Sequence, residues 1–320
     1  MRQHLVFIMI LIILASAAAC QQTFLSPPPA TDRATPRPLL LNATQPPRAV
    51  AGLPPATATP APPPDAARAS ATPLIDPRPL TRAAPPTALP PGWFEVGRTA
   101  EGRAINARRF GDGPRALLLV GGIHGGWEAN TVALVEELIA HFEANPADVL
   151  PGLALVLVPA ANPDGLARGR GADSRFNARG VDLNRNWGCE WSAEAVWRDQ
   201  PVDPGPRPFS EPETQALAAL VRQLQPAAAL FYHSAASGVY AGSCLEDHGS
   251  ARLAQVVGAA AGYGYGQPFS AYAVTGTAAS WVDGQGIPAA DVELQSSADS
   301  EFARNLAGVL ALQRWLADGG

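Results

Sequence analysis

The chain has 320 residues, 33 of them proline, and a formal net charge of −5. It contains no lysine, so arginine supplies all the permanent cations. The acidic balance and the lack of a basic block argue against nucleic acid as the main partner, since a phosphate-binding surface needs clustered cations. The missing amine argues against phosphate-loop, kinase and Schiff-base chemistry, each of which uses a lysine.

The N-terminus, residues 1–20, has the pattern of an export signal. Arg2 and His4 precede the apolar residues 5–14, and small residues follow up to Cys20. The apolar run is short for a membrane span. Ala17-Ala-Ala-Cys20 resembles a bacterial lipobox, which predicts that Cys20 is lipidated and anchors the protein in a membrane outside the cytoplasm. Cleavage at a nearby Ala-x-Ala site, giving a secreted protein without an anchor, is the alternative.

Two further regions follow the signal. Residues 21–91 are rich in Pro, Ala and Thr and have few large apolar side chains. Such a segment cannot bury enough surface to offset its ordering entropy, so we predict a disordered tether. Residues 92–320 return to apolar runs and glycine-bounded turns, over a length that is ample for one globular domain.

Within this domain, apolar runs at residues 115–120 and 153–158 predict strands that are buried on both faces, and residues 130–141 between them have helical spacing;. Ser210-Glu-Pro-Glu213 has the pattern of a capping box and predicts a helix to about residue 224. Strands are also predicted at 227–232 and 287–294, and helices at 250–261 and 301–316. Alternating strands and helices predict an α/β fold, with a mixed, mainly parallel twisted sheet and helices on both faces.

Polar residues occur where the predicted strands end. His124 and Glu128 follow the first strand, His233 ends the strand at 227–232, and Glu293 lies in the last strand. In such sheets, ligands gather at the carboxyl ends of the strands. Two imidazoles and a carboxylate can hold Zn²⁺ with one position left for water, and a second carboxylate can take the proton of that water. The sequence therefore predicts a zinc site at this edge of the sheet.

Over about residues 92–318 the chain resembles the zinc carboxypeptidase family, in particular its short bacterial members that trim cell-wall peptides. The matching motifs are Gly-Ile-His124, Asn162-Pro-Asp-Gly165, Gly180-Val-Asp-Leu-Asn-Arg-Asn-Trp187, His233-Ser234, Tyr272 ahead of Thr275-Gly276, and Val292-Glu293-Leu294. The resemblance implies the fold of that family and one zinc ion per chain, held by His124, Glu128 and His233.

The resemblance also implies roles for five other residues. Glu293 would be the general base and later the proton donor, and Arg175 would polarise the scissile carbonyl. The terminal carboxylate of a peptide substrate would be bound by Asn184, Arg185 and Tyr272. Asp291 competes for the role of base, because it shares a face with Glu293 if the segment is extended.

The chain departs from the family at one point. His124 and Glu128 are separated by three residues, whereas the family commonly has two. Glu128 is the only acid between Asp112 and Glu136, so no other local carboxylate can replace it. We expect a one-residue bulge at Gly125-Gly126 to restore the geometry, since glycine tolerates unusual dihedral angles.

These features predict an exported zinc exopeptidase that hydrolyses the C-terminal amide bond of peptides. A peptidase for γ-D-glutamyl-diaminopimelate bonds of the cell wall, a non-catalytic peptide-binding lipoprotein and a hydrolase of N-acyl amino acids are the alternatives. Residues 277–280, expected to carry side-chain specificity, have no charge, which disfavours a substrate ending in Lys or Arg;. The oligomeric state has no signature in the sequence.

Cysteine and tryptophan residues give two further expectations. In an oxidising compartment, Cys189 and Cys244 are predicted to form a disulfide that braces the cleft, with two unpaired thiols as the alternative. Trp187, Trp191 and Trp197 either form a wall of the cleft or pack in the core.

Overall fold

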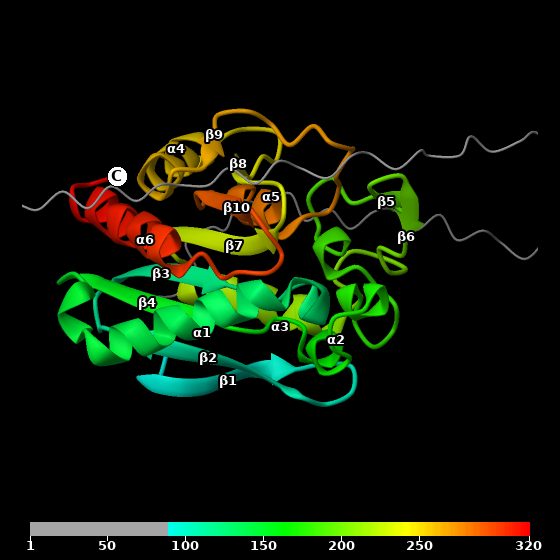
Figure 1. Cartoon of the computed structure of the whole chain (residues 1–320), viewed down its shortest axis with the longest axis horizontal. Helices are drawn as coiled ribbons and strands as arrows, with labels where there is room; N and C mark the ends of the chain where they lie inside the picture. Colours follow the sequence, from blue (N-terminus) through cyan, green and yellow to red (C-terminus); the bar gives the residue numbers. More distant parts are fainter. Residues whose placement is uncertain (1–88) are drawn as a thin grey trace, which may run out of the picture. The chain divides into compact units, whose positions relative to one another are not determined.

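The computed structural model describes residues 89–320, which form an α/β domain (Figure 1). The predicted export signal with Cys20, and the predicted tether up to residue 88, lie outside the described residues. Leu89 is buried in the core, so ordered packing begins before residue 92. Among residues 89–320, no helix has the length and apolar character needed to cross a membrane.

An eight-stranded sheet runs through the domain in the order β1-β2-β4-β3-β7-β10-β8-β9. The central strands β4, β3, β7 and β10 are parallel to one another. The pairs β1–β2, β2–β4 and β10–β8 are antiparallel, and β9 joins β8 in parallel. The predicted mixed, mainly parallel sheet is thereby confirmed. The strands are β1 (Gly92–Arg98), β2 (Ala104–Phe110), β3 (Arg115–Val120), β4 (Leu153–Val158), β7 (Ala228–Ser234), β8 (Gly238–Ala241), β9 (Gly264–Tyr265) and β10 (Ala289–Leu294).

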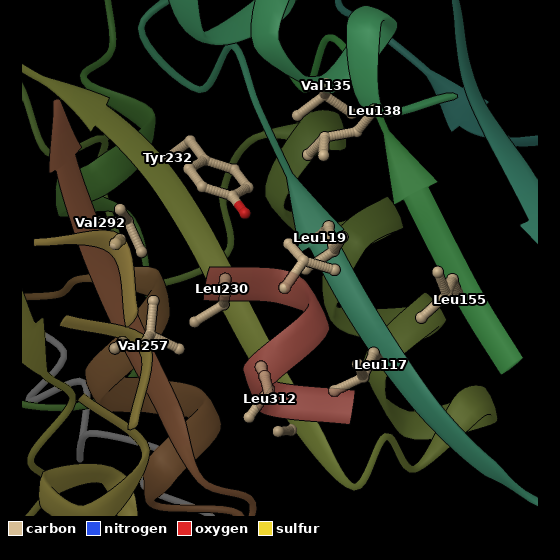
Figure 2. Packing of buried hydrophobic residues seen from close by; sticks show 14 of the residues in the cluster. Leu117, Leu119, Val135, Leu138, Leu155, Leu230, Tyr232, Val257, Val292 and Leu312 are labelled. Atoms are coloured by element: carbon tan, nitrogen blue, oxygen red, sulfur yellow. The ribbon is translucent and has the colours of Figure 1, made fainter. Parts of the chain in front are cut away.

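Helices cover both faces of this sheet because the central strands are apolar on both sides. Side chains alternate along β3: Leu117 and Leu119 point to one core, and Leu118 and Val120 point to the other;. Figure 2 shows the first core, with Leu117 and Leu119 near Leu312 and Leu230. It is covered by α1 (Ala129–Ala144), α4 (Ser250–Ala261) and α6 (Phe302–Ala317), and the second core by α3 (Pro212–Leu224) and α5 (Ala278–Asp283).

The helix predicted from Ser210 is present, but its capping box is not. α3 begins at Pro212, and its N-cap residue Glu211 makes no side-chain capping bond. The hydroxyl of Ser210 donates instead to Glu211 Oε1, at 2.8 Å. The prediction of the cap was wrong because Asn186 donates to the hydroxyl of Ser210, while Asn177 and the backbone N–H of Ala100 donate to the carboxylate of Glu213.

Cys189 and Cys244 form a disulfide, with their Cα atoms 5.9 Å apart. This disulfide confirms the predicted pairing, so the alternative of two free thiols was wrong. The bond joins the loop after the 3₁₀ turn η4 (Leu183–Arg185) to the loop after β8. Because β8 is antiparallel to β10, the loop after β8 lies beside the amino end of β10, and the disulfide joins the loop after η4 to this region.

Candidate active site

The turn after β3 brings the first two predicted zinc ligands together. His124 leads into the 3₁₀ turn η1 (Gly125–Glu128), in which Gly125 has φ +46°. A Cβ on Gly126 would lie 2.0 Å from the carbonyl oxygen of Gly169, so only glycine fits there;. The turn leaves His124 Nδ1 2.8 Å from Glu128 Oε1. The expected bulge therefore takes the form of a 3₁₀ turn, which accommodates the extra residue.

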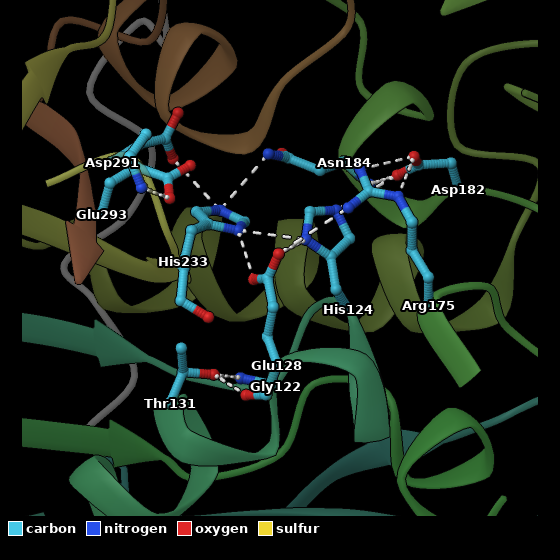
Figure 3. A network of polar contacts seen from close by, with 12 residues as sticks. Gly122, His124, Glu128, Thr131, Arg175, Asp182, Asn184, His233, Asp291 and Glu293 are labelled. Atoms are coloured by element: carbon cyan, nitrogen blue, oxygen red, sulfur yellow. Dashed lines mark hydrogen bonds and ion pairs between the residues drawn. The ribbon is translucent and has the colours of Figure 1, made fainter. Parts of the chain in front are cut away.

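His233 completes the group from the carboxyl end of β7. Its Nδ1 lies 3.3 Å from His124 Nδ1 and 3.2 Å from Glu128 Oε2 (Figure 3). All three side chains are buried, and one ligand atom from each lies within 4.8 Å of the others. Two imidazole nitrogens and a carboxylate that face one point are the donor set of a catalytic zinc site.

The electrostatics of the group also suit a cation. Burial opposes ionisation of Glu128, but His124 and His233 outweigh it and hold the pKa of Glu128 well below its ordinary value. Burial also opposes protonation of His233, but Asp291 and Glu128 raise the pKa of His233 well above its ordinary value. The site thus favours positive charge beside a carboxylate, and a divalent ion would replace the proton. The residues present fit one zinc ion.

Asp182 connects the ligand group to Arg175. Its Oδ1 lies 3.3 Å from His124 Nε2, and its Oδ2 accepts hydrogen bonds from Arg175 Nε and Nη2 at 3.0 and 2.8 Å. Burial opposes ionisation, but the charge of Arg175 holds the pKa of Asp182 well below its ordinary value. Asp182 also accepts from the backbone N–H of Asn184, so it orders its own loop as well as orienting Arg175. The sequence motif at 180–187 was the only signal of its place in the site.

Arg175 is held on a second side by an aromatic ring. Its guanidinium carbon lies 4.6 Å from the ring centroid of Trp197, which belongs to the hairpin of β5 (Ala195–Trp197) and β6 (Gln200–Val202). Trp197 lines the cavity, whereas Trp187 is fully buried against Trp281. Trp191 donates to the carbonyl of Pro204. Of the three tryptophans, Trp197 forms a wall of the site and Trp187 packs in the core.

The two acids of β10 have different neighbours. Glu293 lines the cavity with His124 and Glu128, and its Oε2 accepts from the backbone N–H of Ala236 at 3.2 Å. Asp291 instead lies 3.4 Å from Nε2 of His233, the ring nitrogen that faces away from Glu128. Burial raises the pKa of Glu293 to about 7, with Glu128 contributing and His233 opposing. Glu293 is therefore the acid that faces the ligand group.

The cavity has a volume of about 420 Å³ and continues into a narrower recess. The recess is lined by Asn184, Arg185 and Tyr272, the residues expected to bind a carboxylate. Arg185 is buried and donates to the backbone carbonyls of Val196 and Asn184, which fix its guanidinium. Burial raises the pKa of Tyr272, with Arg175 and Arg185 opposing, so its phenol keeps its proton. The structure thus brings all the predicted site residues of the domain to one cavity.

Comparison with known proteins agrees with this geometry. The model of the family described as zinc carboxypeptidase matches residues 93–303. Human carboxypeptidase A6 is 32% identical over 151 residues, which are 41% of this chain and 34% of that protein. Murein peptide amidase A of Escherichia coli K12 is 32% identical over 178 residues, 50% of this chain and 64% of that protein. The chain thus spans about a third to two thirds of the length of these curated relatives.

The fold is shared with solved structures. The crystal structure of murein-tripeptide amidase from Escherichia coli O157 superposes with a TM-score of 0.53 at 24% identity, covering 72% of this chain and 95% of that one. The family match itself spans most of the described domain and includes all three residues of the ligand group. The chain belongs to the zinc carboxypeptidase family.

Proposed function

We propose that this protein is a zinc-dependent exopeptidase that hydrolyses the C-terminal amide bond of peptides with a free carboxylate. One observation carries the proposal. The ligand atoms of His124, Glu128 and His233 converge within 4.8 Å, at the edge of a cavity that Glu293 and Arg175 also line. A metal-binding group, an ionisable acid and a fixed guanidinium facing one cavity are the parts that amide hydrolysis requires.

The chain's own residues would divide the reaction as follows. When bound to the three ligands, zinc supplies a Lewis acid that polarises a carbonyl and lowers the pKa of water. Glu293 accepts the proton of the attacking water, and a pKa raised to about 7 suits exchange near neutral pH;. Arg175, oriented by Asp182, donates N–H groups to the oxygen on which negative charge develops;. Glu293 then returns the proton to the leaving amine.

The recess accounts for cleavage at the end of a chain. Within the described domain, Arg185 donates hydrogen bonds to backbone carbonyls and to no carboxylate, so its charge is available to a ligand carboxylate;. The amide of Asn184 and the phenol of Tyr272 add two donors in the same recess;. A peptide that lacks a free carboxylate would leave these donors unpaired, and we therefore expect weak binding of amidated peptides.

The test combines metal analysis with three substrates: a peptide with a free C-terminus, the same peptide amidated, and an N-acyl amino acid. The proposal expects one zinc per chain and hydrolysis of the free peptide before the other two. Stoichiometric zinc without hydrolysis would favour a non-catalytic binding protein. Faster hydrolysis of the N-acyl amino acid than of the free peptide would favour a hydrolase of N-acyl amino acids.

Cell-wall peptides are the second candidate substrate. The 32% identity to a protein named murein peptide amidase A supports this choice. We further propose that Cys20 is lipidated and that residues 21–91 tether the domain to a membrane outside the cytoplasm, which would bring it to a wall substrate. Mass spectrometry of products from a γ-D-glutamyl-diaminopimelate peptide tests the substrate. Membrane fractionation of Cys20→Ser tests the anchor, which is excluded if the variant stays with the membrane.

A further inference from the structure

The recess beside the expected carboxylate-binding residues contains an acid that the proposed reaction does not use. Asp291 lies on β10, in register with Phe231 of β7 and Tyr240 of β8, and its side chain lines the recess. The side chain is 20% exposed, but its Oδ1 atom is buried and has no hydrogen-bond partner among the described residues. A carboxylate in such a place gains more from a cationic partner than one in water.

No arginine supplies that partner in the described part of the chain. Among residues 89–320, the only group within ion-pair distance of Asp291 is His233, with Nε2 at 3.4 Å and without the geometry of a hydrogen bond. Asp182, the corresponding acid beside His124, instead accepts two N–H groups from Arg175. Among the described residues, the imidazole of His233 is therefore the one basic group beside Asp291, and no guanidinium pairs with it.

The recess presents opposite charges at neighbouring points. Arg185 has no carboxylate partner among residues 89–320, and Asp291 has no guanidinium partner. The amide of Asn184 and the carboxylate of Asp291 approach the same atom, Nε2 of His233, at 3.3 and 3.4 Å. A C-terminal residue with a cationic side chain carries the two complementary charges, one on its carboxylate and one on its side chain.

The shape of the recess restricts that side chain. Its volume of about 50 Å³ is small beside the 420 Å³ of the outer cavity, which favours an unbranched chain over a ring. Tyr240, Phe269 and Tyr272 surround it, with successive ring centroids 5.4 and 5.0 Å apart. Aromatic faces suit both methylene groups and a cation.

The charge-free segment at residues 277–280 does not describe this recess. Only Thr277 of that segment lines it, because Ala278 and Ala279 are buried in the core beside α3. The acid comes from β10 instead, on the strand that also carries Glu293. The lack of charge at residues 277–280 therefore does not make the recess uncharged, because Asp291 also lines it.

We infer that Asp291 is a specificity-determining residue that selects substrates whose C-terminal residue has a slender cationic side chain, such as lysine, ornithine or diaminopimelate. The inference rests on the proposed exopeptidase function and names its substrate class. The carboxylate of that residue meets Arg185, and its ammonium group meets Asp291.

The decisive variant is Asp291→Asn, which keeps the size of the side chain and removes its charge. The full-length, zinc-loaded protein is assayed on N-acylated dipeptides ending in lysine or in norleucine, which has nearly the same chain without the ammonium group. We expect the native protein to favour lysine in kcat/KM by about 30-fold or more, as for a desolvated charge pair. Asp291→Asn abolishes this preference while the norleucine substrate and the zinc content change little.

Asp199→Asn is the matched control, because Asp199 lines the outer cavity and its loss changes net charge equally. The control should keep the preference for lysine. Equal rates for lysine and norleucine in the native protein overturn the inference. So does a loss of zinc, or of both activities together, in Asp291→Asn, because Asp291 would then act by holding His233.

A binding measurement separates this inference from the proposed function. Calorimetry with free lysine and free norleucine needs no turnover, so it reports on Asp291 even if no peptide is cleaved. Tighter binding of lysine that Asp291→Asn abolishes supports the inference, and equal binding contradicts it. A γ-D-glutamyl-diaminopimelate peptide assayed beside the lysine peptide identifies the source of the cation, and Asp291→Asn should impair whichever of the two is the better substrate.

Discussion

The two imidazoles of the candidate zinc site each have a carboxylate beside their outer nitrogen, and the two carboxylates are held very differently. Asp182, beside His124, is fully buried and accepts hydrogen bonds from Arg175 and from the backbone of Asn184. Asp291, beside His233, is 20% exposed and accepts none from the described residues. The hydrogen-bonding capacity of Asp182 is filled by the protein itself, and Asp182 in turn positions His124 and Arg175. Asp291 lines the recess, where its carboxylate is free to accept a hydrogen bond or ion pair from a ligand.

Replacing Glu293 should have the largest effect on activity, because Glu293 is the proposed proton acceptor and lines the cavity with His124 and the recess with His233. Glu293→Gln should lower kcat by about 10,000-fold. Zinc content measured by atomic absorption should stay at the native level, since Glu293 lies outside the ligand group. Activity near that of the native protein would move the role of base to another acid, with Asp291 as the first candidate.

Replacing Asp182 should affect all substrates alike, in contrast to Asp291. In Asp182→Asn, zinc affinity should fall by about 10- to 100-fold, because the ring of His124 loses its orienting carboxylate. The metal-free protein should also lose about 3 kcal/mol of unfolding free energy, since Arg175 remains buried without its partner;. Chelator competition and denaturant unfolding measure the two effects. If Asp182→Asn changed the ratio of the cleavage rates for the lysine and norleucine substrates, Asp182 would also affect specificity, and the proposed difference between Asp182 and Asp291 would be wrong.

Zinc binding should release a proton from the imidazole of His233. Burial opposes protonation, but Asp291 and Glu128 raise the pKa of His233 well above its ordinary value, so the metal-free protein keeps this proton at neutral pH. Zinc affinity should therefore rise about 10-fold per pH unit up to the raised pKa, if one proton is displaced. In the metal-free protein, the stability gained from this proton is present at low pH and is lost as pH rises through the raised pKa. Calorimetry in buffers of different ionisation enthalpy counts the protons, and a count of zero contradicts the prediction.

The smallest effect is expected from the aromatic support of Arg175. Trp197→Ala removes the ring under the guanidinium but leaves both hydrogen bonds to Asp182. We expect kcat to fall by about 10-fold, the equivalent of one buried cation–π contact, while zinc affinity is retained. Trp191→Ala is the control, because Trp191 donates to the carbonyl of Pro204 and is not among the residues that line the cavity or the recess. Equal losses in the two variants would mean that the hairpin, and not the ring, supports Arg175.

Local patterns predicted the parts of the fold that depend on local sequence. The runs at 115–120 and 153–158 are strands because their side chains are apolar on both faces, and the helices at 250–261 and 301–316 show the expected spacing. The antiparallel strands β1 and β2 were not predicted, because β1 alternates between half-buried and exposed side chains and has little apolar signal. Its pairing with β2 depends on contacts that no local pattern encodes.

In the candidate active site as well, some residues could be predicted from the sequence and others could not. Resemblance placed the three ligands, Glu293 and Arg175, because each belongs to a short motif at a strand end or loop. The role of Asp182 and the position of Asp291 could not be predicted, since each depends on an imidazole more than fifty residues away along the chain. Asp291 and Glu293 share a face of β10, but only the strand register and the packing of β7 decide that Asp291 lies 3.4 Å from Nε2 of His233.

The two glycines after His124 have a consequence for how relatives of this chain are identified. Their turn absorbs one additional residue without moving either donor atom out of reach. The count of positions between the first histidine and its glutamate is therefore not a reliable criterion for deciding whether such a protein can bind a metal. Search patterns that fix this count would discard competent proteins, whereas patterns that allow a glycine pair in exchange for one more position would retain them.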